Sequence, residues 1–155
     1  MSRRLIALLA VIFACLGLAA GTGPEAIAAT TTPANYLGAT GILPPATDDG
    51  ILCEVGVDYP HKSMHVPTTV NVSAEVDCSD PVTLIDLTVD LYRNGVLVNY
   101  NFFAKGPGST LIGRTHADCV TGNYTAEADV TVDFPTGFPR VISDTFYSPT
   151  IHITC

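Results

Sequence analysis

The chain has 155 residues, with 15 acidic side chains against 7 Lys or Arg, so its net charge is −8 at pH 7. This length suits one domain with its own core and is too short for two well-cored ones. An acidic chain without a basic stripe repels polyanions, so we expect no nucleic acid among its partners.

Residues 1–28 have the pattern of a secretory signal peptide. Arg3 and Arg4 precede an apolar run over residues 5–20, and residues 26–28 (Ala-Ile-Ala) place small side chains at the −3 and −1 positions of a cleavage site. The run is slightly short for a membrane span. We therefore predict cleavage after residue 28, secretion into the extracellular space, and no membrane contact of the mature chain.

Two other kinds of export signal are alternatives to the general secretory signal peptide. Residues 12–15 loosely resemble a lipobox, which would lipidate Cys15, but the bulky Phe13 fits that motif poorly. Residues 2–6 loosely resemble a twin-arginine signal, although a longer polar segment is typical there. The general secretory route remains the favoured prediction.

Residues 29–50 are rich in Thr, Pro, Gly and Ala and show neither a helical nor a strand period. This composition predicts a flexible leader, with the alternative that its end docks against the domain. We place the start of the folded domain at Ile51.

From residue 51 onward, apolar and polar residues alternate, which is typical of strands with one buried face. Asn94-Gly95 separates two such runs and predicts a two-residue type I′ hairpin. The fold class predicted is all-β, an antiparallel immunoglobulin-like sandwich of about seven strands, with a closed barrel as the alternative. The predicted strands cover residues 51–58, 69–78, 85–92, 96–104, 110–117, 124–134 and about 146–155.

Four cysteines follow the leader: Cys53, Cys78, Cys119 and Cys155. An even number in an exported domain predicts two disulfides. A zinc site needs close pairs such as C-x₂-C, which the chain lacks, so we expect no metal and no cofactor. Of three connectivities, we favour Cys53–Cys78 and Cys119–Cys155, because each links the ends of sequence-adjacent strands. We expect Cys53, Cys78 and Cys155 to face the core.

Several stretches between Ile51 and Cys155 follow a shared pattern with this four-cysteine spacing. They are residues 60–67, residues 70–78, Leu91-Tyr92-Arg93-Asn94-Gly95, residues 119–124, Phe134-Pro135-Thr136-Gly137 and Ile153-Thr154-Cys155. The pattern resembles a group of small secreted β-sandwich proteins of unknown function from actinobacteria. The resemblance implies export and the fold, and it supplies no catalytic residues.

Arg114, His116 and Asp118 fall on one side of a predicted strand, just before Cys119. A guanidinium, an imidazole and a carboxylate in line could grip a polar ligand, or His116 could act as a base. The favoured interpretation is a solvated strand face with cross-strand charge pairs. Because no G-x-S-x-G nucleophile occurs, we predict no catalytic residues.

Tyr100 and Phe103, with Tyr92 and Phe102, give the predicted hairpin a surplus of aromatic residues. An exposed patch of this kind could bind a partner or a glycan. The favoured alternative is packing in the core.

Acidic residues face outward on two predicted strands and could collect a divalent ion if those strands lie side by side. They are Asp86, Asp90, Glu127, Asp129 and Asp133. A calcium loop of the D-x-D-x-D-G type is absent, so the favoured interpretation is a soluble acidic face.

His61 and His65 have a spacing that suits a metal on a helix. Pro60 and Pro67 make a helix improbable there, so we predict a polar loop.

The leading functional hypothesis is a secreted, non-enzymatic module that binds an extracellular protein, glycan or small molecule, or acts structurally. The alternative is an inhibitor of secreted hydrolases, which would present the loop at residues 135–139, expected near the last disulfide. An enzyme that uses His116 with Asp118 or Arg114 is the third hypothesis.

Overall fold

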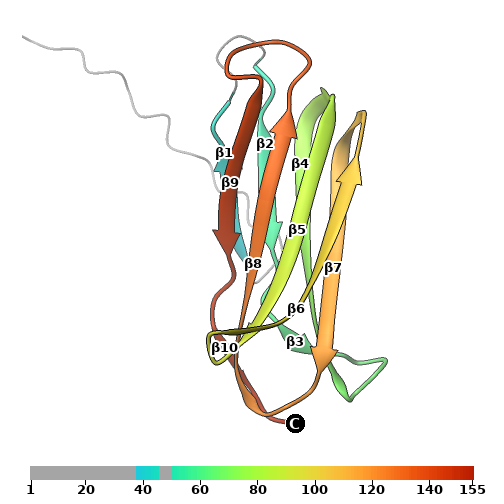
Figure 1. The fold of residues 1–155 in the computed structure, drawn as a ribbon, viewed down its shortest axis with the longest axis vertical. Coiled ribbons are helices and arrows are strands. Elements are labelled where there is room, and N and C mark those ends of the chain that lie inside the picture. Colours follow the sequence, from blue (N-terminus) through green and yellow to red (C-terminus); the bar gives the residue numbers. More distant parts are fainter. Residues whose placement is uncertain (1–37, 46–49) are drawn as a thin grey trace, which may run out of the picture. The chain divides into compact units, whose positions relative to one another are not determined.

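The computed structural model describes residues 38–45 and 50–155 (Figure 1). The predicted signal peptide, its cleavage site, Cys15 and most of the predicted leader lie outside these residues. The described part of the chain contains ten β-strands and no helix. The strands are β1 (Ala39–Leu43), β2 (Cys53–Val57), β3 (His61–Lys62), β4 (Thr69–Val82), β5 (Leu84–Arg93), β6 (Val96–Lys105), β7 (Gly108–Asp118), β8 (Gly122–Asp133), β9 (Val141–Tyr147) and β10 (Ile151–Ile153).

The strands form two antiparallel sheets of five strands each. In the first sheet β1 pairs with β2 and β2 with β4, while β7 pairs along the opposite edge of β4. The short β3 shares with β2 one edge of β4. In the second sheet β6 pairs with β5 and β5 with β8, and β9 and β10 share the far edge of β8.

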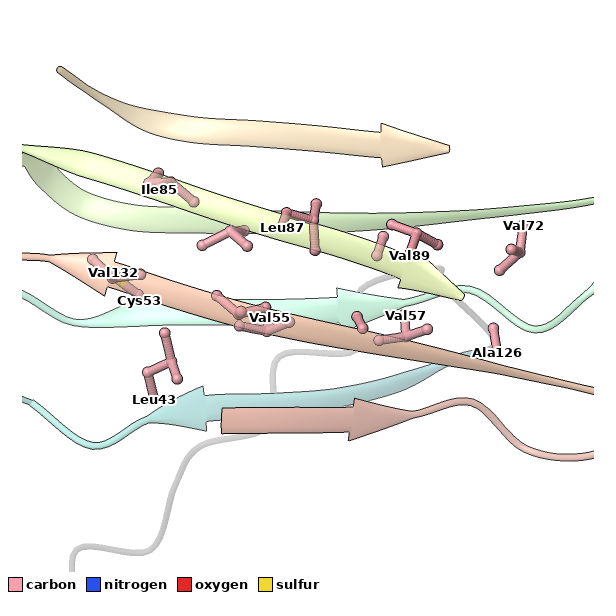
Figure 2. Close-up of a cluster of buried hydrophobic side chains, with 14 of the residues drawn as sticks. Leu43, Cys53, Val55, Val57, Val72, Ile85, Leu87, Val89, Ala126 and Val132 are labelled. Atoms are coloured by element: carbon pink, nitrogen blue, oxygen red, sulfur yellow. The ribbon is translucent and has the colours of Figure 1, made fainter. Parts of the chain in front are cut away.

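Alternation of apolar and polar residues gives each sheet one buried and one wet face, as predicted. The core lies between the sheets and contains inward side chains from both, such as Val55 and Val57 of β2 and Leu87 and Val89 of β5 (Figure 2). These four side chains are fully or almost fully buried. Full burial of a Val or Leu is worth about 1.5–3 kcal/mol, so this cluster is the main source of stability.

The predicted hairpin turn is confirmed. Asn94 has φ 51° and Gly95 has φ 78°, and a type I′ turn requires positive φ at both central residues. The turn sets the pairing of β5 with β6, in which Arg93 lies opposite Val96.

The strand count exceeds the predicted seven for three reasons. The last predicted strand is divided into β9 and β10, a two-residue strand β3 follows β2, and β1 arises within the predicted leader. The domain start predicted at Ile51 is therefore wrong, and so is the flexible leader over residues 29–50 where it includes β1; there the stated alternative holds, in which the end of the leader docks against the domain. Leu43 is fully buried, and Gly41 packs so closely against the Phe146 ring that a side chain there would collide with it.

Both predicted disulfides are confirmed. Cys53 and Cys78 lie directly opposite each other on β2 and β4 and are buried. Cys119 follows β7 and joins the last residue, Cys155. The expectation that Cys155 faces the core is wrong, because β10 ends at Ile153 and Cys155 is exposed. Two intramolecular disulfides are consistent with an oxidising environment.

Candidate functional site

The outer face of the first sheet carries a row of polar side chains from three strands. Ser73, Glu75 and Asp77 alternate with buried residues of β4 and so point away from the core. Cross-strand pairing places Glu54 of β2 opposite Asp77, and Arg114 of β7 opposite Ser73. Residues 23 and 41 positions apart in the sequence thus lie opposite each other on one surface.

A hollow of about 340 Å³ opens on this face; we call it the Gly56 hollow. Gly56 lies opposite Glu75 of β4 on one side and Thr40 of β1 on the other. With no side chain at position 56, this part of the lining is backbone. Its lining consists of Thr40, Glu54, Gly56, Asp58, Ser73, Ala74, Glu75, Asp77, Ile112 and Arg114.

The fold itself does not require glycine at position 56. Its φ is not in the positive region, and a Cβ built there would meet no atom within 4 Å beyond its chain neighbours. Glycine inside a strand weakens the strand, and it often marks a place where a ligand or another backbone approaches closely. Since no other backbone crowds Gly56, its effect on this surface is to leave a space open.

A second hollow of about 300 Å³ adjoins the first; we call it the histidine hollow. It is lined by His61, Asn71, Val72, Ser73, Arg114, Thr115 and His116. Ser73 and Arg114 belong to both linings, so the two hollows meet at this cross-strand pair. The Thr115 hydroxyl is buried and has no hydrogen-bond partner among the described residues.

Hydrogen bonds occupy some carboxylates of the Gly56 hollow and leave others open. The Ser73 hydroxyl donates to Asp58, and the Thr110 hydroxyl donates to Asp77 at 2.9 Å. Within the described part of the chain, the side chains of Glu54, Glu75 and Arg114 make no hydrogen bond or ion pair; the one ion pair there joins Arg140 and Asp133. The hollow thus presents two open carboxylates and one open guanidinium.

Side chains of β6 contact the backbone of β7, the strand that contains Arg114 and His116. The Asn101 side-chain amide donates to the Arg114 carbonyl at 2.9 Å, and the Asn99 amide donates to the His116 carbonyl at 2.6 Å. These amides engage the backbone at the edge of β7. Neither asparagine is among the candidates predicted from the sequence; their alternation with Tyr100 and Phe102 along β6 is the signal that places them on the inner side of the strand.

The structure brings together only some of the predicted ligand-binding residues. Arg114, His116 and Asp118 lie on the outer face of β7, as predicted, and Arg114 and His116 line hollows whereas Asp118 does not. Tyr100 is exposed on the outer face of the second sheet, away from them. Phe103 is half-buried and packs against the core, as the favoured interpretation expected, so the possible ligand-binding role weighed for it is not supported.

Three of the five predicted outward acidic residues meet on the second sheet. Asp90 lies directly opposite Glu127, and the carboxylate oxygens of Asp90, Glu127 and Asp129 lie within 4.8 Å of one another. Partial burial, and then the charge of Asp129, raise the pKa of Glu127 and of Asp90. Partial burial, followed by the charges of Glu127 and Asp90, raises the pKa of Tyr92 to about 12. Exposed acidic groups often gather in this way without an ion.

The loop after β8 lies at the opposite end of that strand from Cys119 and Cys155, so its expected position near the last disulfide is wrong (Figure 1). Phe138 in this loop is 78% exposed. Arg140 holds the base of the loop by donating to the Phe134 carbonyl and pairing with Asp133, both at 3.2 Å.

His61 and Lys62 form β3 rather than a loop, and both are exposed. Within residues 38–45 and 50–155 no helix is long and apolar enough to cross a bilayer. Comparison of the chain with models of known families, and with curated proteins, found no match. The resemblance to secreted actinobacterial proteins stays a prediction.

Proposed function

We propose that this protein is a secreted, non-enzymatic module that binds a small polar molecule in the Gly56 hollow. The observation that carries the proposal is a glycine that the fold does not need, in the lining of a hollow with open charged groups. Two further features support secretion: residues 1–28 have the pattern of a signal peptide, and the disulfides suit an oxidising compartment.

We also propose that the two sheets form an immunoglobulin-like sandwich. Seven of the strands matter for this comparison: β2, β4 and β7 share one sheet, and β5, β6, β8 and β9 share the other. This matches strands A, B and E against C, C′, F and G of that fold. The buried Tyr124, near the start of β8, donates its hydroxyl to the Val120 carbonyl at 2.7 Å, as in the tyrosine corner of such domains.

The contacts of Ser73 do not form the serine–histidine pair of a hydrolase. Its hydroxyl is the one serine hydroxyl in the two linings, which also contain His61 and His116. An activated serine donates its proton to a base such as histidine. Ser73 instead donates to Asp58. The two hollows therefore offer charged and hydrogen-bonding groups, and their one serine is not paired with a histidine base.

The test fills the hollow without disturbing the scaffold. Because a Cβ at position 56 meets no neighbour, Gly56→Val should fold and should raise the melting temperature by a few degrees through the better strand propensity of valine. Ligands found by a ligand-observed NMR screen of small polar molecules should bind Gly56→Val at least tenfold more weakly.

The matched control is Thr88→Val, which places valine on the outer face of the second sheet and should leave binding unchanged. The proposal fails if no molecule in the screen binds, or if Gly56→Val binds every molecule as well as the unaltered protein does. A lowered melting temperature for Gly56→Val would instead show a structural need for glycine.

A second candidate function, inhibition of secreted hydrolases, is favoured by the exposed Phe138 on a loop with an anchored base. Such a loop suits a protease that cleaves after aromatic residues. Incubation with chymotrypsin should then slow hydrolysis of a chromogenic substrate, and Phe138→Ala should abolish the effect. Unchanged hydrolysis with excess protein would remove this candidate.

A further inference from the structure

The two adjoining hollows differ in charge. The Gly56 hollow is lined by four carboxylates, from Glu54, Asp58, Glu75 and Asp77, with Arg114 at its boundary. The histidine hollow has no carboxylate in its lining and contains Arg114 with the imidazoles of His61 and His116. One continuous surface therefore has an acidic end and an end with cationic and N–H donor groups.

The register of the strands sets the spacing between these ends. Along β4, the outward residues Glu75, Ser73 and Asn71 follow one another at intervals of two residues. Two residues of a strand span about 6.6–6.8 Å. Ser73 lies opposite Arg114, and Asn71 lies opposite both His61 and His116. The acidic row at Glu75 is thus about 7 Å from the row of Arg114 and about 13 Å from the row of histidines.

The open charged groups on this surface have not neutralised one another. Arg114 forms no ion pair with another described residue, although Glu75 lies one row away. Glu54 and Asp77, directly opposite each other, have like charges, an arrangement that destabilises a sheet. An ammonium group would relieve this repulsion, and a carboxylate would satisfy the forked donors of the guanidinium.

We infer that the joined hollows bind a zwitterion, with its ammonium group over Gly56 beside Glu54 and Glu75 and its acidic group at Arg114 and the histidines. This inference rests on the proposed function and names the chemistry of its ligand. The charged groups of the ligand would lie about 7–13 Å apart. A peptide of three residues in extended form, with both termini free, has this chemistry and about this length.

The experiment uses trialanine and three capped forms: the N-acetyl peptide, the C-terminal amide, and the doubly capped peptide. Each is titrated into the disulfide-intact protein and followed by the backbone amide signals in ¹H–¹⁵N spectra. Trialanine should shift the signals of residues 54–56, 73–75 and 114–116. Each single cap should weaken binding at least tenfold, and the double cap should weaken it further.

Variants assign each charge to its end of the surface. Arg114→Gln should abolish the difference between trialanine and its amide, and Glu75→Gln should reduce the difference between trialanine and its N-acetyl form. Arg93→Gln, which removes a positive charge on the second sheet, is the matched control and should preserve both differences.

Failure of this inference differs from failure of the proposed function. Two outcomes would overturn the zwitterion alone. In the first, capped peptides bind as tightly as trialanine. In the second, trialanine does not bind, while other molecules bind the unaltered protein and bind Gly56→Val more weakly. Binding of trialanine that Gly56→Val does not weaken would overturn the proposed site as well.

Discussion

At the scale of single residues, the carboxylates of the second sheet show how an acidic surface lowers the stability of the fold. Asp90 and Glu127 are half-buried, directly opposite each other, and close to Asp129. The Tyr92 hydroxyl donates to Asp90 at 3.4 Å and relieves only part of the repulsion. Burial and neighbouring charge therefore make the protonated form of Glu127 more favourable in the folded protein than in the unfolded chain.

This shift has a definite sign in the dependence of stability on pH. The pKa of Glu127 is raised above its ordinary 4.5, so the folded protein binds more protons than the unfolded chain in the range just above that value. The free energy of unfolding therefore falls as the pH rises through this range, and the loss is complete above the raised pKa. Glu127→Gln should gain about 0.2–1 kcal/mol at pH 7, the size of a cross-strand charge pair in a partly solvated position.

Urea unfolding between pH 4 and pH 7 measures this effect. The Glu127→Gln profile should be flatter than that of the unaltered protein. Asp80→Asn, which removes an exposed charge outside the cluster, should leave the slope unchanged. A destabilised Glu127→Gln at pH 7 would contradict the prediction.

At the scale of elements, β6 and β7 show how an edge strand is kept from pairing with another molecule. The amides of Asn99 and Asn101 occupy two carbonyls of β7, and the Lys105 ammonium donates to a third, that of Thr110, at 2.9 Å. Unpaired strand edges invite association between chains. Side chains of β6 therefore donate hydrogen bonds to the carbonyls of β7, as the backbone of a neighbouring strand would.

Removal of both amides tests this role. Asn99→Ala with Asn101→Ala should lower the free energy of unfolding by about 1–3 kcal/mol, because each hydrogen bond contributes about 0.5–1.5 kcal/mol. The double variant should also self-associate, as sedimentation velocity would reveal. Thr88→Ala, at an outward position of β5, is the control that should stay monomeric if the parent is monomeric. A double variant with unchanged stability and sedimentation would argue against the role.

The strands differ in how far they could be predicted from the sequence. Alternation over eight or more residues was sufficient for β4, β5 and β8, because their pattern records a buried and a wet face. Strand β1 has five residues within a Pro- and Gly-rich stretch, and it exists because β2 offers an edge. That pairing is a tertiary effect and leaves almost no local signal.

The candidate site divides in the same way. Arg114 and His116 were placed on one face correctly, because a strand fixes the side of every second residue. The hollow itself depends on the register of β2, β4 and β7, which brings Gly56 and Glu75 beside each other and Arg114 one row away. Gly56 itself carries no signal in the sequence, since the lack of a side chain matters only once its neighbours are known.

At the scale of the whole molecule, the two disulfides close different parts of the fold. Cys53–Cys78 joins directly paired strands of the first sheet, whereas Cys119–Cys155 ties the end of the chain to the corner between β7 and β8. In the chain-entropy model each is worth about 3–4 kcal/mol at these loop lengths. Total stabilities of small domains are only about 5–15 kcal/mol.

Loss of the second disulfide should therefore remove a large part of the total stability. Cys155→Ser should sharply lower the yield of folded protein. The double variant Cys119→Ser, Cys155→Ser should lose about 3–4 kcal/mol of the free energy of unfolding, measured by denaturant titration. The double variant leaves no unpaired thiol at this corner, so it separates lost cross-linking from wrong pairing. A normal melting curve for both variants would refute the structural role.

The bare backbone at Gly56 has a consequence for changing what this protein recognises. Most binding pockets are shaped by many interlocking side chains, so their redesign disturbs the framework. Here one position in the lining of the Gly56 hollow has no side chain, and a Cβ added there meets no neighbour, so a larger residue should make the hollow shallower. A series of alanine, serine and valine at that position would grade its depth in single-atom steps, and a library at this codon alone would be a direct way to new specificities.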